Sequence, residues 1–237
     1  MIVDGINKGD ASKPGKPETA KPVAEGWKPA KDMAEAGKWA ESHGYKLQGF
    51  DDVPLANVIN EQMEKDFKKH GSFPALLQGK VTIKKANIVG GQIGLRTDGL
   101  EILTRSNKSL AEMVKVFEEK KGRNWNLGNG RSGIGGLKHT INHELGHMRG
   151  ATAFKVESIS TSMSDLQALY ESKKVVPGDF GGYVGSYSKT WSRAGINKRM
   201  VLLDESFAEL YAVARAGELD KLSPTLRAFI LEHPDVF

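Results

Sequence analysis

HELGH, residues 143–147, lies in a segment whose apolar residues recur with helical periodicity. Positions i and i+4 of a helix lie on the same side, so the imidazoles of His143 and His147 can reach one metal ion. Zinc accepts neutral imidazole nitrogen, and a catalytic zinc site has three protein ligands and a water. Glu144 lies beside the position of that water, where a carboxylate can act as general base. The motif therefore predicts an active-site helix with a zinc centre.

The third ligand must come from outside this motif. The chain has no cysteine, and Ala153 occupies the position of the third histidine in the pattern HExxHxxGxxH. The only later histidine is His233, near the end of the chain. A helix expected at 204–216 carries Glu205 and Glu209, which are one turn apart and share a face. Such a pair on its own is typical of a solvent-exposed helix face. A carboxylate on a partly buried helix needs a partner, however, and a zinc ion bound by HELGH would supply one. We therefore favour Glu209 as the third ligand.

HELGH followed by the helix FAELYA, residues 207–212, resembles the gluzincin peptidases related to the anthrax toxin lethal factor. The resemblance implies a zinc-dependent peptidase in which a glutamate of the Phe-Ala-Glu helix completes the zinc site with His143 and His147. By that match the third metal ligand is Glu209, with Glu205 as the alternative. The substrate would be a peptide or protein, and Glu144 would be the catalytic base.

The same family has a tyrosine in a Tyr-x-x-Thr stretch that polarises the scissile carbonyl. YSKT at 187–190 resembles it and implies that Tyr187 is a second catalytic residue. The segment between this stretch and the acidic helix is longer than in the family, and Tyr183 remains the alternative. The glycines around both tyrosines predict a mobile loop.

Upstream of HELGH, the order of elements over about 30–217 is similar to metallopeptidase-like domains attached to phage Mu-type head-morphogenesis proteins. This resemblance implies a phage or prophage origin, in the virion or the bacterial host cytoplasm. The activity would serve virion maturation or act on a host protein. The alternative is a non-catalytic virion component that keeps a zincin fold. The intact Glu144 argues against it, because a structural metal site has no use for a base.

The expected fold is an α+β zincin with a small twisted sheet, the HELGH helix and a mainly helical C-terminal part. Three strands are predicted, VTIKK at 81–85, QIGLRT at 92–97 and LEILTRS at 100–106, with turn signals at Gly90-Gly91 and Asp98-Gly99. LEILTRS is expected near the site, where an edge strand could bind a peptide by β-addition. Helices are predicted at about 33–43, 54–70, 109–119, 137–149, 164–173, 204–216 and from 223.

The first 30 of the 237 residues contain a series of Lys-Pro pairs and few large apolar side chains. Such a segment cannot bury enough surface to offset its ordering entropy, so 1–30 is predicted to be a disordered tail and 31–237 the metallopeptidase domain. The tail could tether the domain to capsid or portal proteins. The first 30 residues hold five lysines and four acidic residues and so contribute only +1 to the net charge of +5; a solvated basic surface is preferred over nucleic acid as a partner. We find no signal peptide and no apolar run that could span a membrane, so a membrane partner is not expected.

Two weaker patterns lie near the motif. Glycines at 128, 130 and 133 match GxGxxG, but no strand and acidic ribose partner frame them, so a loop over the active-site helix is the preferred interpretation. His139 precedes His143 by one turn. An exposed histidine at the start of the helix is expected there, and a group behind the ligands is the alternative.

Overall fold

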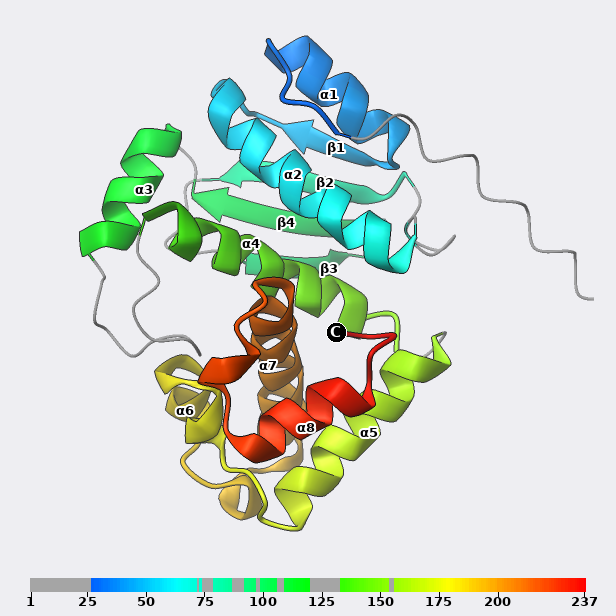
Figure 1. Cartoon of the computed structure of the whole chain (residues 1–237), viewed down its shortest axis with the longest axis vertical. Helices are drawn as coiled ribbons and strands as arrows, with labels where there is room; N and C mark the ends of the chain where they lie inside the picture. The colour runs from blue at the N-terminus through cyan, green and yellow to red at the C-terminus, as the bar shows by residue number, and fades with distance from the viewer. Residues whose placement is uncertain are drawn as a thin grey trace, which may run out of the picture.

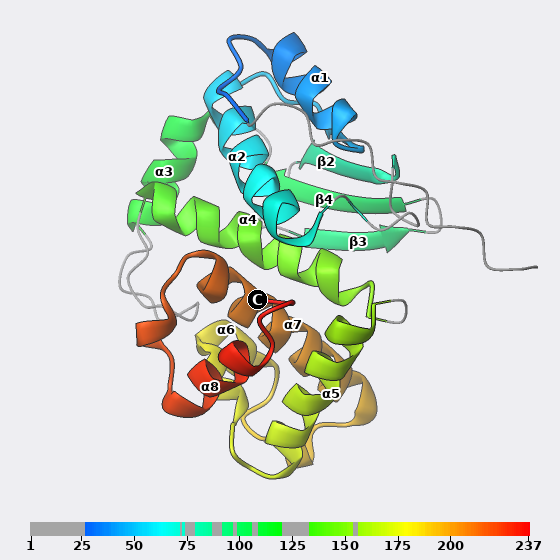
Figure 2. The same cartoon turned by 45° about the vertical axis from the view of Figure 1, so that its right-hand side comes forward.

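The computed structural model describes residues 27–71, 73, 79–86, 92–96, 99–105, 109–119, 133–153 and 156–237. Two layers lie on opposite sides of a central helix, α4 (Gly133–Gly150), as Figures 1 and 2 show. One layer holds the sheet with α1 (Met33–Ser42), α2 (Val53–His70) and α3 (Leu110–Glu119). The other is helical and contains α5 (Glu157–Glu171), η1 (Pro177–Phe180), α6 (Gly182–Tyr187), η2 (Trp191–Arg193), α7 (Ile196–Arg215), η3 (Leu219–Lys221) and α8 (Pro224–Glu232). The described part is mostly helical with one small sheet, in agreement with the α+β class.

The described strands form one sheet in the order β1-β2-β4-β3. The strands β1 (Tyr45–Gln48), β2 (Val81–Ala86) and β4 (Gly99–Arg105) are parallel, and β3 (Gln92–Arg96) pairs antiparallel with β4. The pairing of β3 with β4 agrees with the expected hairpin, whereas β2 pairs with β4 rather than with its neighbour in sequence. LEILTR is therefore an inner strand, and the edge strand that contacts α4 is QIGLR.

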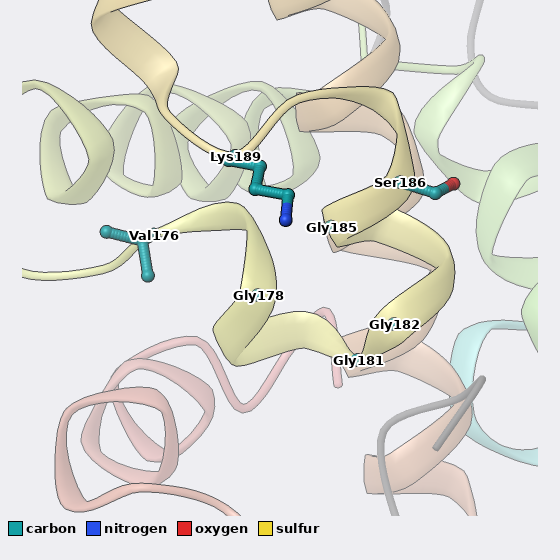
Figure 3. Close-up of a pocket in the computed structure, with 7 residues that line it drawn as sticks. All are labelled: Val176, Gly178, Gly181, Gly182, Gly185, Ser186 and Lys189. Carbon is teal, nitrogen blue, oxygen red and sulfur yellow. The ribbon is translucent and has the colours of Figure 1, made fainter. Parts of the chain in front are cut away.

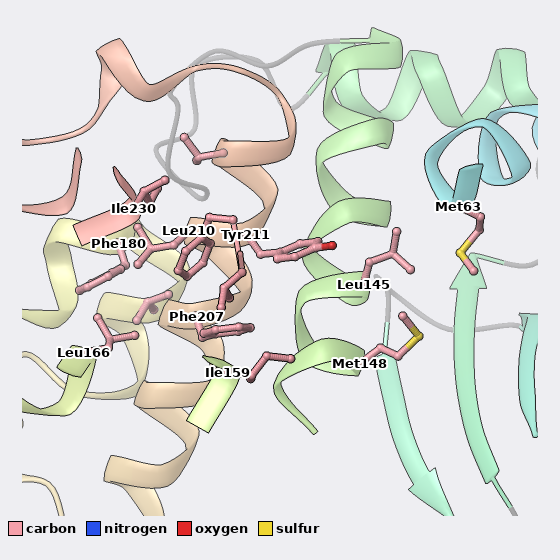
Figure 4. Packing of buried hydrophobic residues seen from close by; sticks show 14 of the residues in the cluster. Met63, Leu145, Met148, Ile159, Leu166, Phe180, Phe207, Leu210, Tyr211 and Ile230 are labelled. Atoms are coloured by element: carbon pink, nitrogen blue, oxygen red, sulfur yellow. The ribbon is translucent and has the colours of Figure 1, made fainter. Parts of the chain in front are cut away.

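The helix α4 packs on both of its sides, because its residues face the sheet layer on one side and α7 on the other (Figure 4). Leu145 and Met148 lie toward Met63 of α2 and are almost fully buried. On the opposite side, α7 approaches α4 at Gly146, where an added Cβ would lie only 2.7 Å from the Cα of Ala208. No side chain fits in that space. The close crossing of HELGH and FAELYA thus depends on the glycine of the first motif and the alanine of the second.

A row of polar pairs holds α4 against α2. Arg149 donates hydrogen bonds to Asp66, and Asp66 also accepts one from Tyr211 of α7. All three residues are buried, at 4%, 0% and 0% exposure. Nearer the start of α4, the amide of Asn142 donates to Gln62 at 3.2 Å. Because buried polar groups need specific partners, this row fixes the register between the two helices.

Several helices begin earlier than the sequence indicates. The helix α4 starts at Gly133 instead of 137, and α5 covers Glu157–Glu171 although only its second half was expected. The helix α7 starts at Ile196, eight residues before the expected 204. The sequence-based start of α7 marks where the helix becomes buried, because Ile196 and Met200 in its first turns are 77% and 66% exposed.

The folded part includes residues that the sequence placed in the tail. The backbone N–H of Ala30 donates to Asn57 Oδ1 at 2.9 Å, and Asn57 Nδ2 donates back to the Ala30 carbonyl at 3.0 Å. Trp27 N–H lies 3.4 Å from Glu64 Oε1. These contacts begin a few residues before the predicted boundary at 30/31. The rest of the predicted tail and most of the GxGxxG loop lie outside the described residues. Among the described helices, none is long and apolar enough to cross a bilayer.

Candidate metal centre

Two helices bring the ligand atoms of the candidate site together. His143 Nε2 lies 3.0 Å from His147 Nε2, and Glu205 Oε2 of α7 lies 3.1 Å from the first and 3.3 Å from the second. The three side chains form a group that could hold a metal ion. Two imidazoles and a carboxylate are a common ligand set for zinc, and tetrahedral donors at about 2.0–2.1 Å from zinc lie about 3.3 Å apart. The donor types and their spacing therefore fit a zinc ion.

The structure brings Glu205 into this group, whereas the sequence favoured Glu209. Glu209 Oε1 lies 3.2 Å from His143 Nδ1, on the opposite edge of the imidazole from Glu205. The reason lies in the crossing of the helices. As α7 passes α4 at Gly146, the two glutamates, one turn apart, contact opposite edges of the same ring. Glu209 is 1% exposed and takes the place of a carboxylate that orients a metal-binding histidine.

The second histidine has an orienting carboxylate as well. His147 Nδ1 lies 2.9 Å from Asp204 Oδ2. The Asp204 side chain is half-exposed, unlike that of Glu209. Asp204 was not identified from the sequence, although its position directly before Glu205 was a usable signal. Each imidazole thus has one nitrogen on a carboxylate behind it and the other directed to the shared point.

Tyr187, the last residue of α6, reaches the same group. Its phenol donates a hydrogen bond to Glu205 Oε1 at 3.0 Å. The long segment before Glu205 does not keep it away, because η2 and the additional first turns of α7 occupy that segment. Tyr183 also lies in α6, but its side chain is outside the described residues. The structure thus places the Tyr187 phenol at the site.

The charges at the site are strongly coupled. Burial lowers the pKa of His143, but hydrogen bonds with Glu205 and Glu209 outweigh it and raise that pKa to about 10. His147 behaves alike: its contacts with Asp204 and Glu205 overcome burial and raise the pKa to about 9. Burial raises the pKa of Glu144, and the neighbouring histidine charges partly offset this effect.

We expect the metal-free protein to lose stability as the pH rises from 6.5 to 10. Because the folded pKa values of His143 and His147 lie above their usual 6.5, their contribution is complete below pH 6.5 and disappears through about 9 and 10. Zinc competes with the same protons, so its stabilising effect should grow over that range. Thermal unfolding at pH 6, 8 and 9.5, with chelator and with zinc, measures both trends. A metal-free melting temperature that rises over this range would contradict the expectation.

A hollow next to α6 is a separate feature (Figure 3). Gly178 of η1 and Gly185 of α6 pack so closely that a Cβ on the latter would lie 3.3 Å from the Cα of the former. The hollow has no histidine or acidic side chain in its lining, so it is not a metal site. Its lining residues are Val176, Gly178, Gly181, Gly182, Gly185, Ser186 and Lys189.

The chain matches no known family model, and comparison with curated proteins and with solved structures finds no match. A function for this chain therefore has to be argued from the side chains of α4, α6 and α7.

Proposed function

We propose that the chain is a zinc-dependent endopeptidase of the gluzincin type. The observation that carries the proposal is the convergence of His143 Nε2, His147 Nε2 and Glu205 Oε2 beside Glu144. Three protein ligands leave a position for water, which is the arrangement of catalytic zinc sites, whereas structural sites are closed by four ligands. In this proposal Glu205 is the third ligand, and Glu209 orients His143.

The residues around the ligands supply the remaining steps. When bound, zinc would polarise the scissile carbonyl and increase the acidity of the attacking water. Glu144 accepts the proton of that water and passes it to the leaving amine. Its burial keeps the carboxyl pKa above its usual value, which suits a group that must both take and return a proton. The phenol of Tyr187 turns from Glu205 to the substrate oxygen and donates to the charge that develops there.

The sheet offers a place for the substrate backbone. Since β3 is the edge strand and contacts α4, an extended peptide could add to it beside the site. We extend the proposal to a phage or prophage protein, acting in virion maturation or on a host protein, with capsid or portal proteins as partners of the N-terminal tail. The second candidate is a non-catalytic virion component. The position of Glu144 beside the ligand group favours the enzyme.

The ligand assignment has a direct test. We expect about one zinc per chain in the wild type. Glu205→Ala should lose zinc binding, because only the two histidine ligands remain. Glu209→Ala should bind zinc about 10–100-fold more weakly, the usual effect of removing an orienting group. Glu171→Ala, at the exposed end of α5, is the control. Elemental analysis and chelator competition measure these values. A larger loss in Glu209→Ala than in Glu205→Ala would overturn the assignment.

The activity itself is tested with the zinc-loaded chain on denatured protein and on peptide libraries. New amino termini should appear, disappear with chelator and return with zinc. A chain that binds zinc at this site and cleaves nothing in these libraries would favour the virion component.

A further inference from the structure

His139 is buried where the sequence suggested a surface residue. It is 0% exposed and lies in the second turn of α4, which begins at Gly133. Its Nε2 lies 3.0 Å from Glu209 Oε2. The other oxygen of Glu209 contacts His143 Nδ1 at 3.2 Å. One buried carboxylate thus joins two histidines of α4 that are a turn apart.

This chain of contacts determines which nitrogen of His143 can bind a metal. A neutral imidazole carries one proton, so a hydrogen on Nδ1 that is donated to Glu209 leaves the Nε2 lone pair for the ion. Glu209 offers Oε1 to this nitrogen. At 1% exposure it has little access to water, so protein donors must stabilise its charge. His139 donates to the oxygen that His143 does not use.

The two orienting carboxylates differ in this respect. Asp204, behind His147, is half-exposed, and water can complete its hydrogen bonds. Glu209 is enclosed between α4 and α7, so water does not replace a hydrogen bond that is lost there. The carboxylate is then held from one side only, and the His143 ring loses part of the support that directs its Nε2 at the ligand group.

We propose that His139 is a positioning residue of the metal centre, which acts through Glu209 to hold the His143 ring with its Nε2 directed at the ligand group. The inference deepens the proposed function and rests on the same ligand group. His139 itself does not touch the metal or the substrate.

The test compares substitutions that keep or remove the donor. His139→Gln keeps an N–H that can reach Glu209, whereas His139→Phe and His139→Met fill the space without one. We expect the two apolar variants to bind zinc about 10–100-fold more weakly than the wild type, at unchanged stoichiometry, and the glutamine variant to stay within a few-fold. The control is His233→Phe, which removes another histidine near a carboxylate, Asp165, far from the ligands in sequence. Chelator competition with zinc, and with cobalt followed by its visible spectrum, gives the affinities.

The apolar pair keeps the test decisive if one variant does not fold, because methionine is flexible enough to fill a site that the phenylalanine ring does not fit. In addition, Glu209→Leu and the double variant Glu209→Leu/His139→Met complete a cycle. If His139 acts through Glu209, the second substitution adds almost nothing to the first. Wild-type affinity in folded His139→Phe or His139→Met, additive effects in the cycle, or a glutamine variant as weak as the apolar ones would each overturn the inference.

This result is separable from the peptidase proposal. A wild type that binds zinc but cleaves no peptide would refute the proposed activity and leave the role of His139 intact. A wild type that binds no zinc would refute both.

Discussion

Replacing Glu144 by glutamine is expected to lower peptide hydrolysis by roughly 10²–10⁴-fold while zinc content stays at the wild-type level. Glutamine has the shape of glutamate but cannot accept a proton from water at neutral pH. Glu144 lies within α4 between the two histidine ligands in sequence and is not part of the ligand group. The substitution therefore removes the base and leaves the metal-binding atoms in place.

The measurement is the turnover number at saturating peptide, with zinc determined in the same samples. A matched control is Glu64→Gln, because Glu64 is also a buried helical glutamate, at 4% exposure, but belongs to α2 and pairs with Lys68. The control should retain wild-type turnover. Undiminished hydrolysis by the Glu144→Gln enzyme would show that another group takes the proton, and the mechanism would have to be withdrawn.

The part of the site that could be predicted from sequence is the part within one helix. The spacing of His143 and His147 alone places both imidazoles on one side of the helix. In the structure their Nε2 atoms lie 3.0 Å apart. The third ligand comes from a second helix, so its identity depends on how α7 crosses α4. Glu205 and Glu209 are one turn apart on the same face of α7. The sequence does not tell which edge of the His143 ring each of them will contact.

The same limit explains the outcome for His139 and Tyr187. His139 was expected at the surface because the apolar pattern begins at Leu137, whereas α4 already begins at Gly133 and His139 packs against Glu209 of α7. The sequence left Tyr183 open as an alternative to Tyr187, because the long segment before the acidic helix does not give the distance in space. Helical turns in the intervening segment bring it back to Glu205. Contacts between elements that are far apart in the chain depend on packing, and local periodicity does not report on packing.

The sheet gives a third example. Three strands were recognised, and the pairing of β3 with β4 follows from the turn signal between them. The parallel pairing of β2 with β4 moves β3 to the edge, and no turn signal encodes it. The four-residue strand β1 was missed because it is too short to show an alternating pattern. The edge strand beside α4 is thus a property of the sheet order.

We expect Arg149→Met to destabilise the fold by about 3–5 kcal/mol, the usual cost of leaving a buried charge without its partner. The guanidinium of Arg149 contacts Asp66, which is completely buried and then keeps only the hydrogen bond from Tyr211. For a chain of this size, the loss corresponds to a fall in melting temperature of roughly 10 °C. Methionine retains most of the length of the side chain, so the change tests the charge more than the packing.

The same two helices provide the control, because Lys138 of α4 pairs with Glu61 of α2 at 2.9 Å with both side chains partly exposed. Lys138→Met should cost less than about 1 kcal/mol, since water replaces the lost partner. Unfolding is measured with chelator present, so that metal binding does not contribute to the apparent stability. Arg149→Met combined with Asp66→Leu should recover part of the loss, because no unpaired charge remains. Equal effects of Arg149→Met and Lys138→Met would mean that water reaches the pair of Arg149 and Asp66. The pair would then not fix the register of α2 and α4 beside the metal centre.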